Sequence, residues 1–309
     1  MMSALKFEKA VDGSDPRPLG FVRQSHPPAL YLALALLWSL SVILLLASLA
    51  GPRSLRPEDL LVSLVFFLVL LFLRAVDEIK DLDYDRIHNP DRPLVRGDIS
   101  VAEVALTAAI AAGLAITISG LLAPALALFV TANLGYGLGL LALERQSAGF
   151  RNSLLLNLVI TFPVSAALNL YAYLYLRELG QAPPPPLGGL AISAHMAAFL
   201  HLEFGRKLRW PQHEPAGGNG YARVLGLPGA IAMCLLTGAG ACALATWVHR
   251  YGGAGVALAL LPWLSLLASA AGLRGLFRAR AKHRDLKRFF GLFMMSFFAL
   301  NILVILAGR

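Results

Sequence analysis

Residues 74–97, RAVDEIKDLDYDRIHNPDRPLVRG, place six carboxylates at the end of an apolar run that is long enough to cross a membrane. Asp77, Asp81 and Asp85 are spaced four residues apart, and Glu78 stands three residues before Asp81. If the apolar helix continues for two more turns, these four side chains lie on one of its flanks. The sequence therefore predicts a cluster of negative charge at one face of the membrane.

Carboxylates this close repel one another unless a cation neutralises them. Oxygen ligands that leave room for water suit Mg²⁺ bound to a substrate phosphate. We therefore expect the four acids to be catalytic, with Glu78, Asp81 and Asp85 as metal ligands. Lys80 and Asp83 point elsewhere on the helix and are expected to be solvated. The alternative interpretation is a solvated helix end whose acids pair with neighbouring Arg and Lys side chains.

The composition excludes an ordinary soluble domain, since 57% of the 309 residues are hydrophobic and only 15% are charged. Apolar windows of the length that spans a bilayer predict an all-α integral membrane protein, a bundle of about nine transmembrane helices. The expected spans are residues 29–50, 59–76, 103–119, 121–143, 153–176, 189–202, 228–248, 255–273 and 290–307.

The positions of Lys and Arg predict the orientation, because basic loops stay on the cytoplasmic side. With the N-terminus inside, 22 of the 27 basic residues fall on that side. The net charge of +9 is then mostly a consequence of topology, and no soluble basic domain remains for nucleic acid. We expect a multi-pass protein with a cytoplasmic N-terminus and a cytoplasmic active-site mouth.

The chain divides into a cytoplasmic N-terminal segment, residues 1–28, and a single transmembrane domain, residues 29–309. The first segment has no short apolar core of the kind found in a cleaved signal peptide. The two connections rich in charge and in Gly or Pro, residues 77–102 and 203–227, fall on the same predicted side. They are therefore expected to meet over the mouth of the bundle.

The first charged connection resembles a known family. Asp77-Glu78-x-x-Asp81-x-x-x-Asp85 is similar to the Asn-Asp-x-x-Asp-x-x-x-Asp signature of the UbiA superfamily of intramembrane prenyltransferases, with Asp replacing Asn and Glu replacing Asp. The following NPDRPLVRG resembles that family's NRPLPSG segment and puts Arg92 in register. The resemblance implies a helical bundle, an isoprenyl diphosphate substrate and Mg²⁺ as cofactor.

The second charged connection departs from the family pattern. Where the family has an Asp-rich segment, residues 201–226 of this chain contain only two acids, Glu203 and Glu214. Their sequence is HLEFGRKLRWPQHEPAGGNGYARVLG. We expect these two acids to bind metal. Arg206 and Lys207 bring positive charge, and with Arg92 and Tyr221 they are expected to bind the diphosphate. The alternative is that the basic run only anchors the sixth helix at the membrane surface.

The function predicted from these features is a Mg²⁺-dependent enzyme of the bilayer that ionises an isoprenyl diphosphate and transfers the prenyl group to an acceptor, which the sequence does not specify. A terpene cyclase of the same superfamily is the nearest alternative, since it also ionises the diphosphate. The Phe-rich segments 65–72 and 288–298 would then be candidates for its pocket. A transporter, a lipid-binding scaffold and a non-catalytic binder of prenyl diphosphate are the remaining alternatives.

Overall fold

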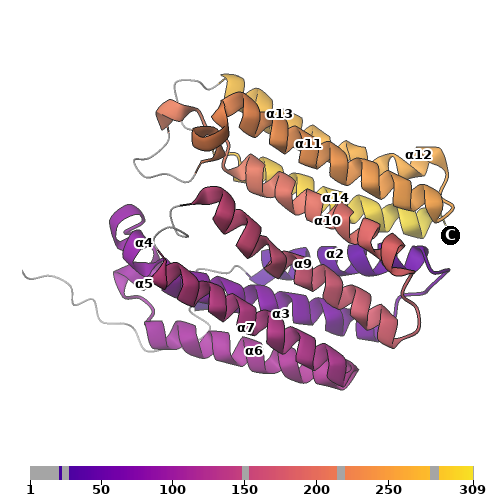
Figure 1. The fold of residues 1–309 in the computed structure, drawn as a ribbon, viewed down its shortest axis with the longest axis horizontal. Helices are drawn as coiled ribbons and strands as arrows, with labels where there is room; N and C mark the ends of the chain where they lie inside the picture. Colours follow the sequence, from indigo (N-terminus) through magenta and orange to yellow (C-terminus); the bar gives the residue numbers. More distant parts are fainter. Residues whose placement is uncertain (1–20, 23–27, 148–152, 214–219, 279–284, 309) are drawn as a thin grey trace, which may run out of the picture.

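A computed structural model describes residues 21–22, 28–147, 153–213, 220–278 and 285–308, and all of the regular structure within these ranges is helical (Figure 1). Nine of the described segments are long and apolar enough to cross a membrane, which confirms the predicted all-α membrane fold. The elements are α2 (Pro28–Ser48), α3 (Pro57–Lys80), α4 (Leu82–His88), α5 (Pro93–Arg96), α6 (Val101–Leu122), α7 (Pro124–Gln146), α9 (Leu154–Glu178), α10 (Pro185–Arg206), η1 (Pro211–His213), α11 (Tyr221–Tyr251), α12 (Val256–Ala259), η2 (Leu261–Ser265), α13 (Leu266–Arg278) and α14 (Lys287–Ala307).

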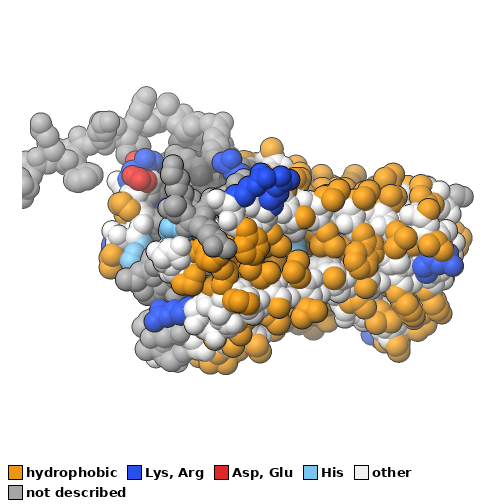
Figure 2. All heavy atoms as spheres, turned by 90° about the horizontal axis from the view of Figure 1, so that it is seen from above, with side chains coloured by type: hydrophobic (Ala, Val, Ile, Leu, Met, Phe, Trp, Pro, Cys, Tyr) orange, Lys and Arg blue, Asp and Glu red, His pale blue; other side chains and the backbone are white. Residues whose placement is uncertain are grey.

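The helix starts follow from local sequence. Several long helices begin at a proline, whose fixed φ and missing N–H suit the first helical turn: α2 at Pro28, α3 at Pro57, α7 at Pro124 and α10 at Pro185. Helix α6 instead begins with a capping box. The Ser100 hydroxyl accepts from the Glu103 N–H, and the Glu103 carboxylate accepts from the Ser100 N–H. The spans are apolar around most of their circumference, as expected for helices that face lipid. Figure 2 shows hydrophobic side chains along the length of the bundle.

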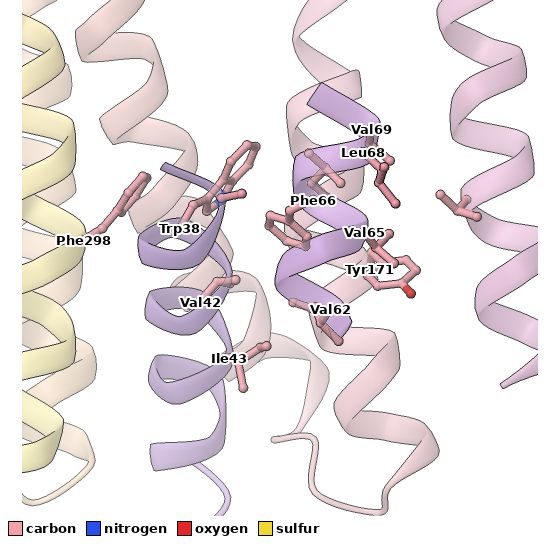
Figure 3. Close-up of a cluster of buried hydrophobic side chains, with 14 of the residues drawn as sticks. Trp38, Val42, Ile43, Val62, Val65, Phe66, Leu68, Val69, Tyr171 and Phe298 are labelled. Atoms are coloured by element: carbon pink, nitrogen blue, oxygen red, sulfur yellow. The ribbon is translucent and has the colours of Figure 1, made fainter. Parts of the chain in front are cut away.

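The core is centred on α2, which packs against α3, α9 and α14 (Figure 3). Trp38 of α2 is its centre: the ring meets Phe66 edge-on at a centroid distance of 5.1 Å and lies 4.2 Å from the ring of Phe199. The indole N–H donates to Asn169 Oδ1 at 2.9 Å. Polar groups within the spans are thus satisfied by neighbouring helices, as a bilayer demands.

The described parts of both charged connections lie at one end of the bundle, where Figure 1 shows α4 and α5 at the same end as the end of α10. Helix α3 does not continue for two more turns as the sequence predicts. It ends at Lys80, and Asp81, with φ −84° and ψ 0°, separates it from α4. The four motif acids therefore do not share a single helical flank, because the chain changes direction in the middle of the motif.

The start of α11 is bent at the same end of the bundle. Gly226 has φ +68° and ψ 158°, a conformation that side chains disfavour, and Pro228 follows it. The bend separates a short first turn, which carries Tyr221, from the long helix that crosses the bundle. Tyr221 is thereby held beside the end of α10, packed 4.6 Å from the ring of Phe204.

A buried ion pair fixes α3 at its other end. Arg53, in the connection before α3, contacts Asp59 Oδ1 at 2.5 Å, and the two side chains are 4% and 1% exposed. Tyr175 of α9 donates to the same carboxylate at 2.9 Å, and Arg53 Nε donates to Gln181 at 2.8 Å. This network ties the α2–α3 connection to the α9–α10 connection.

We predict that Asp59→Asn lowers the free energy of unfolding by about 3–5 kcal/mol, because it leaves the Arg53 guanidinium buried without its counter-ion. Arg177→Met removes an exposed cation near the end of α9 and is expected to change stability by less than about 0.5 kcal/mol. Unfolding titrations with SDS in mixed micelles measure both variants. Equal stability of the two variants would show that the buried pair does not hold the end of α3.

Candidate active site

A cavity of about 870 Å³ lies between the two charged connections and extends among the helices. Its polar end is lined by Asp77 and Lys80 on one side and by Glu203, Arg206 and Lys207 on the other. Apolar side chains line the rest, among them Leu34, Phe162, Phe199, Leu202, Met294 and Met295. The cavity thus suits a molecule with an anionic head and an apolar body, and its volume is typical of ligand pockets.

Two of the four motif acids are buried and share one guanidinium. Glu78 is 1% exposed and Asp85 is 2% exposed, and Arg92 pairs with Asp85 and lies 3.7 Å from Glu78. Arg74 pairs with Glu78 from one turn earlier on α3, and Asn89 donates to Asp85 at 2.6 Å. Arg92 is therefore bound to the motif itself and is not among the residues that line the cavity.

The other two acids share the ammonium of Lys80. Its Nζ lies 3.0 Å from Asp77 Oδ1, 3.8 Å from Asp81 Oδ1 and 3.2 Å from Glu144 Oε2 of α7. The prediction that Lys80 is solvated is therefore wrong: the side chain is 24% exposed and lies inside the carboxylate cluster. Asp83 is solvated as predicted, with 93% of its side chain exposed. Burial raises the pKa of Asp81, and Asp77 and Asp85 add to this rise, which Lys80 opposes.

The facing wall of the cavity is built on Glu203. Both of its oxygens are occupied, Oε2 by Arg206 at 2.5 Å and Oε1 by Lys207 at 2.6 Å. The Tyr221 hydroxyl also donates to Oε1, at 3.2 Å. These four side chains line the cavity together, so the structure brings the predicted diphosphate contacts Arg206, Lys207 and Tyr221 to one place. Glu214 lies outside the described residues.

The start of α14 adds two cations that the sequence reasoning missed. Lys287 and Arg288 line the cavity on the same side as the end of α10. The last helix is held there by close packing, since a Cβ at Gly205 of α10 would come within 2.4 Å of the Phe290 ring. In the sequence, these two cations belong to a basic run that the predicted membrane topology already accounts for. Only the packing of α14 on α10 shows that they reach the cavity.

The side of the cavity that carries Asp77, Asp81 and Lys80, the acidic wall, has donor chemistry that fits a magnesium ion. Asp77 and Asp81 offer carboxylate oxygens that already converge on a cationic centre, the Lys80 ammonium, and Asp77 faces the cavity. Within the described ranges, no three acidic, His or Cys side chains form an assembled metal site on their own. The buried histidines among the described residues are bonded to neighbouring helices, His195 to Ser41, His201 to Ser269 and His249 to Asn301.

The chain is similar in sequence to known proteins. Residues 36–300 match the model of the UbiA prenyltransferase family. A segment of 58 residues is 34% identical to the digeranylgeranylglyceryl phosphate synthase of Methanoculleus marisnigri, and it spans 19% of this chain and only 21% of that relative.

Solved structures match over nearly the whole chain. A UbiA homologue from Aeropyrum pernix K1 is 22% identical, with a TM-score of 0.61 over 90% of this chain and 96% of that one. A UbiA homologue from Archaeoglobus fulgidus bound to DMAPP and Mg²⁺ is 17% identical, with a TM-score of 0.58 over 92% and 98% of the two chains. At these identities the likeness is one of fold.

We predict that Glu203 and Arg206 shift the pKa of Lys207 in opposite directions. Burial lowers the pKa of the Lys207 amine, Glu203 raises it and Arg206 lowers it. Glu203→Gln should therefore lower this pKa further, and Arg206→Gln should raise it. Acylation of the Lys207 amine across a pH series, followed by mass spectrometry, measures both shifts.

The control is Glu58→Gln, an exposed acid at the start of α3 on the other end of the bundle, which should leave the acylation midpoint of Lys207 in place. A midpoint that moves upward in Glu203→Gln would contradict the described contacts.

Proposed function

Because the chain belongs to the UbiA prenyltransferase family, we propose that it ionises an isoprenyl diphosphate in a Mg²⁺-dependent reaction and transfers the prenyl group to an acceptor. The observation that carries this proposal is a cavity that joins described residues of both charged connections to an apolar interior. The diphosphate would lie between the two polar walls, and the prenyl chain would extend along Leu202, Phe199 and Met294.

The acidic wall would hold the metal. Asp77 and Asp81 are the proposed ligands that face the diphosphate, and Glu78 and Asp85 would complete the acidic site from their buried positions beside Arg92. The bound ion would neutralise charge on the diphosphate and polarise the bond to be broken. Arg92, predicted as a diphosphate contact, is better supported as the cation that holds Glu78 and Asp85 in place.

The basic wall would stabilise the leaving group. When the allylic C–O bond breaks heterolytically, its electron pair goes to the pyrophosphate, and fixed cations lower the cost of that charge. Arg206 and Lys207 are oriented for this by Glu203, which we assign to positioning these cations in place of its predicted role as a metal ligand. Tyr221, Lys287 and Arg288 are further donors on the same wall.

The allylic cation left behind would be captured by a nucleophilic atom of the acceptor, which then loses a proton. The relative named digeranylgeranylglyceryl phosphate synthase makes a prenylated glyceryl phosphate a reasonable first product to test. We further propose that the N-terminus and this end of the bundle face the cytoplasm, on the argument from Lys and Arg positions.

A terpene cyclase is the second candidate function, and one observation favours it. Phe162 and Phe199 line the cavity, and aromatic faces stabilise carbocations. The phenylalanines of the Phe-rich segments do not supply this aromatic lining: Phe66, Phe293 and Phe298 are buried in the packed core, and the segment 288–298 reaches the cavity through other side chains, such as Met294 and Met295. The cyclase would differ from the transferase in trapping the cation with a double bond of the same prenyl chain.

We predict that Asp81→Ala lowers pyrophosphate release at saturating Mg²⁺ by at least about 10²-fold, because the acidic wall loses a ligand next to the diphosphate. The matched control is Asp83→Ala, which removes an exposed carboxylate from the same connection and should retain activity within about twofold. Pyrophosphate is measured with a coupled phosphate assay on the purified protein. Full turnover in Asp81→Ala would refute the proposed function.

We predict that the purified protein consumes at least one of geranyl, farnesyl and geranylgeranyl diphosphate only when Mg²⁺ and an acceptor extract are both present. Products are identified by mass spectrometry, with a parallel reaction that lacks acceptor. A prenylated acceptor supports transfer, whereas a cyclic hydrocarbon or alcohol formed without acceptor would replace the transferase proposal by the cyclase.

A further inference from the structure

A fixed cation lies at the centre of the proposed metal site. The Lys80 ammonium contacts Asp77 and Glu144 at 3.0 and 3.2 Å and approaches Asp81 to 3.8 Å. Glu144 comes from α7 and is 10% exposed, and Asn157 of α9 donates to its other oxygen at 2.7 Å. Lys80, Asp77 and Asn157 line the cavity. Three helices thus hold an ammonium group where a metal ion would otherwise meet the carboxylates.

The charges around this wall leave room for one divalent ion. Five described carboxylates contact three described cations, which leaves an excess of two negative charges. The acids are Asp77, Glu78, Asp81, Asp85 and Glu144, and the cations are Arg74, Lys80 and Arg92. One Mg²⁺ balances that excess, whereas a second would make the wall positive before any substrate bound.

The facing wall offers no place for a second ion among the described residues. It presents the cations Arg206, Lys207, Lys287 and Arg288 around the single acid Glu203. Both oxygens of Glu203 are already bound to cations. A divalent ion there would be repelled by an excess of three positive charges and would find no free oxygen on Glu203, the one acid that the described residues place on this wall.

On the premise of the proposed function, we propose that the diphosphate site takes one divalent ion and that the Lys80 ammonium occupies the position of a second. The diphosphate would then be bound by one metal ion on the acidic wall, by Lys80 beside it and by the basic wall opposite. Removal of the Lys80 charge should admit a second ion, because the acidic wall would still carry one uncompensated negative charge after the first ion bound, and the position beside Asp77 and Glu144 would be vacant.

The experiment counts bound ions directly. Mn²⁺ replaces Mg²⁺, and electron paramagnetic resonance measures Mn²⁺ bound to the purified full chain in the presence of farnesyl S-thiolodiphosphate, which resists ionisation. We expect one ion per chain in the wild type and two in Lys80→Met. Without the analogue, Lys80→Met should bind Mn²⁺ at least about tenfold more tightly than the wild type, because a cation that contacts the same carboxylates is lost.

The matched control is Arg86→Met, which removes a cation from the same connection. Arg86 is exposed and pairs only with the exposed Asp83 among the described acids, so this variant should bind one ion with wild-type affinity. Lys80→Arg retains the charge and should also bind one ion. If Lys80→Met does not fold, Lys80→Gln replaces it as the variant without the charge, and the wild-type count tests the number of ions independently of either.

Two ions or none in the wild type, or an unchanged count in folded Lys80→Met, would overturn the inference. The count is repeated with inorganic pyrophosphate, which needs no prenyl recognition. Failure of the wild type to release pyrophosphate from any prenyl diphosphate would instead refute the proposed function, and it is measured in a separate assay. The two failures are therefore distinguishable.

Discussion

Carboxylates placed at the end of a membrane helix must be neutralised, and this requirement organises one whole end of the bundle. The first motif distributes its acids between two cationic centres, Arg92 for the buried pair and Lys80 for the pair nearer the cavity. The second connection solves the opposite problem, because there one acid, Glu203, holds an excess of cations. An acidic wall and a basic wall therefore face each other across the same cavity.

The helices serve this arrangement by holding the two walls at fixed positions. Helix α3 carries the acidic wall at one end and is tied by Asp59 to Arg53 at the other, so it is fixed along its length. Helix α10 carries the basic wall, and its glycine at 205 lets the Phe290 ring of α14 approach closely. Charges held in this way need little rearrangement when a substrate develops new charge, which is the main source of electrostatic catalysis.

Much of this was predictable from the sequence, and the parts that were not have a common cause. Apolar length predicts the nine spans found in the described part of the chain, and the motif spacing identifies the acids that gather at one end. Spacing alone, however, gives positions on one helix and assumes that the helix continues. It therefore missed the break at Asp81 and the inward position of Lys80, whose third partner, Glu144, lies 64 residues further along the chain. Lys287 and Arg288 were missed for the same reason, since only helix packing brings them to the cavity.

The weakened second motif and the lysine inside the first motif can be understood as one change. A metal ion and fixed side-chain cations both neutralise charge on a diphosphate, but they differ in how they reach the site. A metal ion must be captured from solution and gives up part of its water shell, whereas a side-chain cation is already in place and is held by carboxylates of the protein. A site that replaces acids by bases on one wall, and inserts Lys80 on the other, transfers part of the neutralisation from captured ions to the fold. On this proposal, the residues that hold the cations in place are as important to the site as the metal ligands themselves. These residues are Glu144 with Asn157 on the acidic wall and Glu203 on the basic wall.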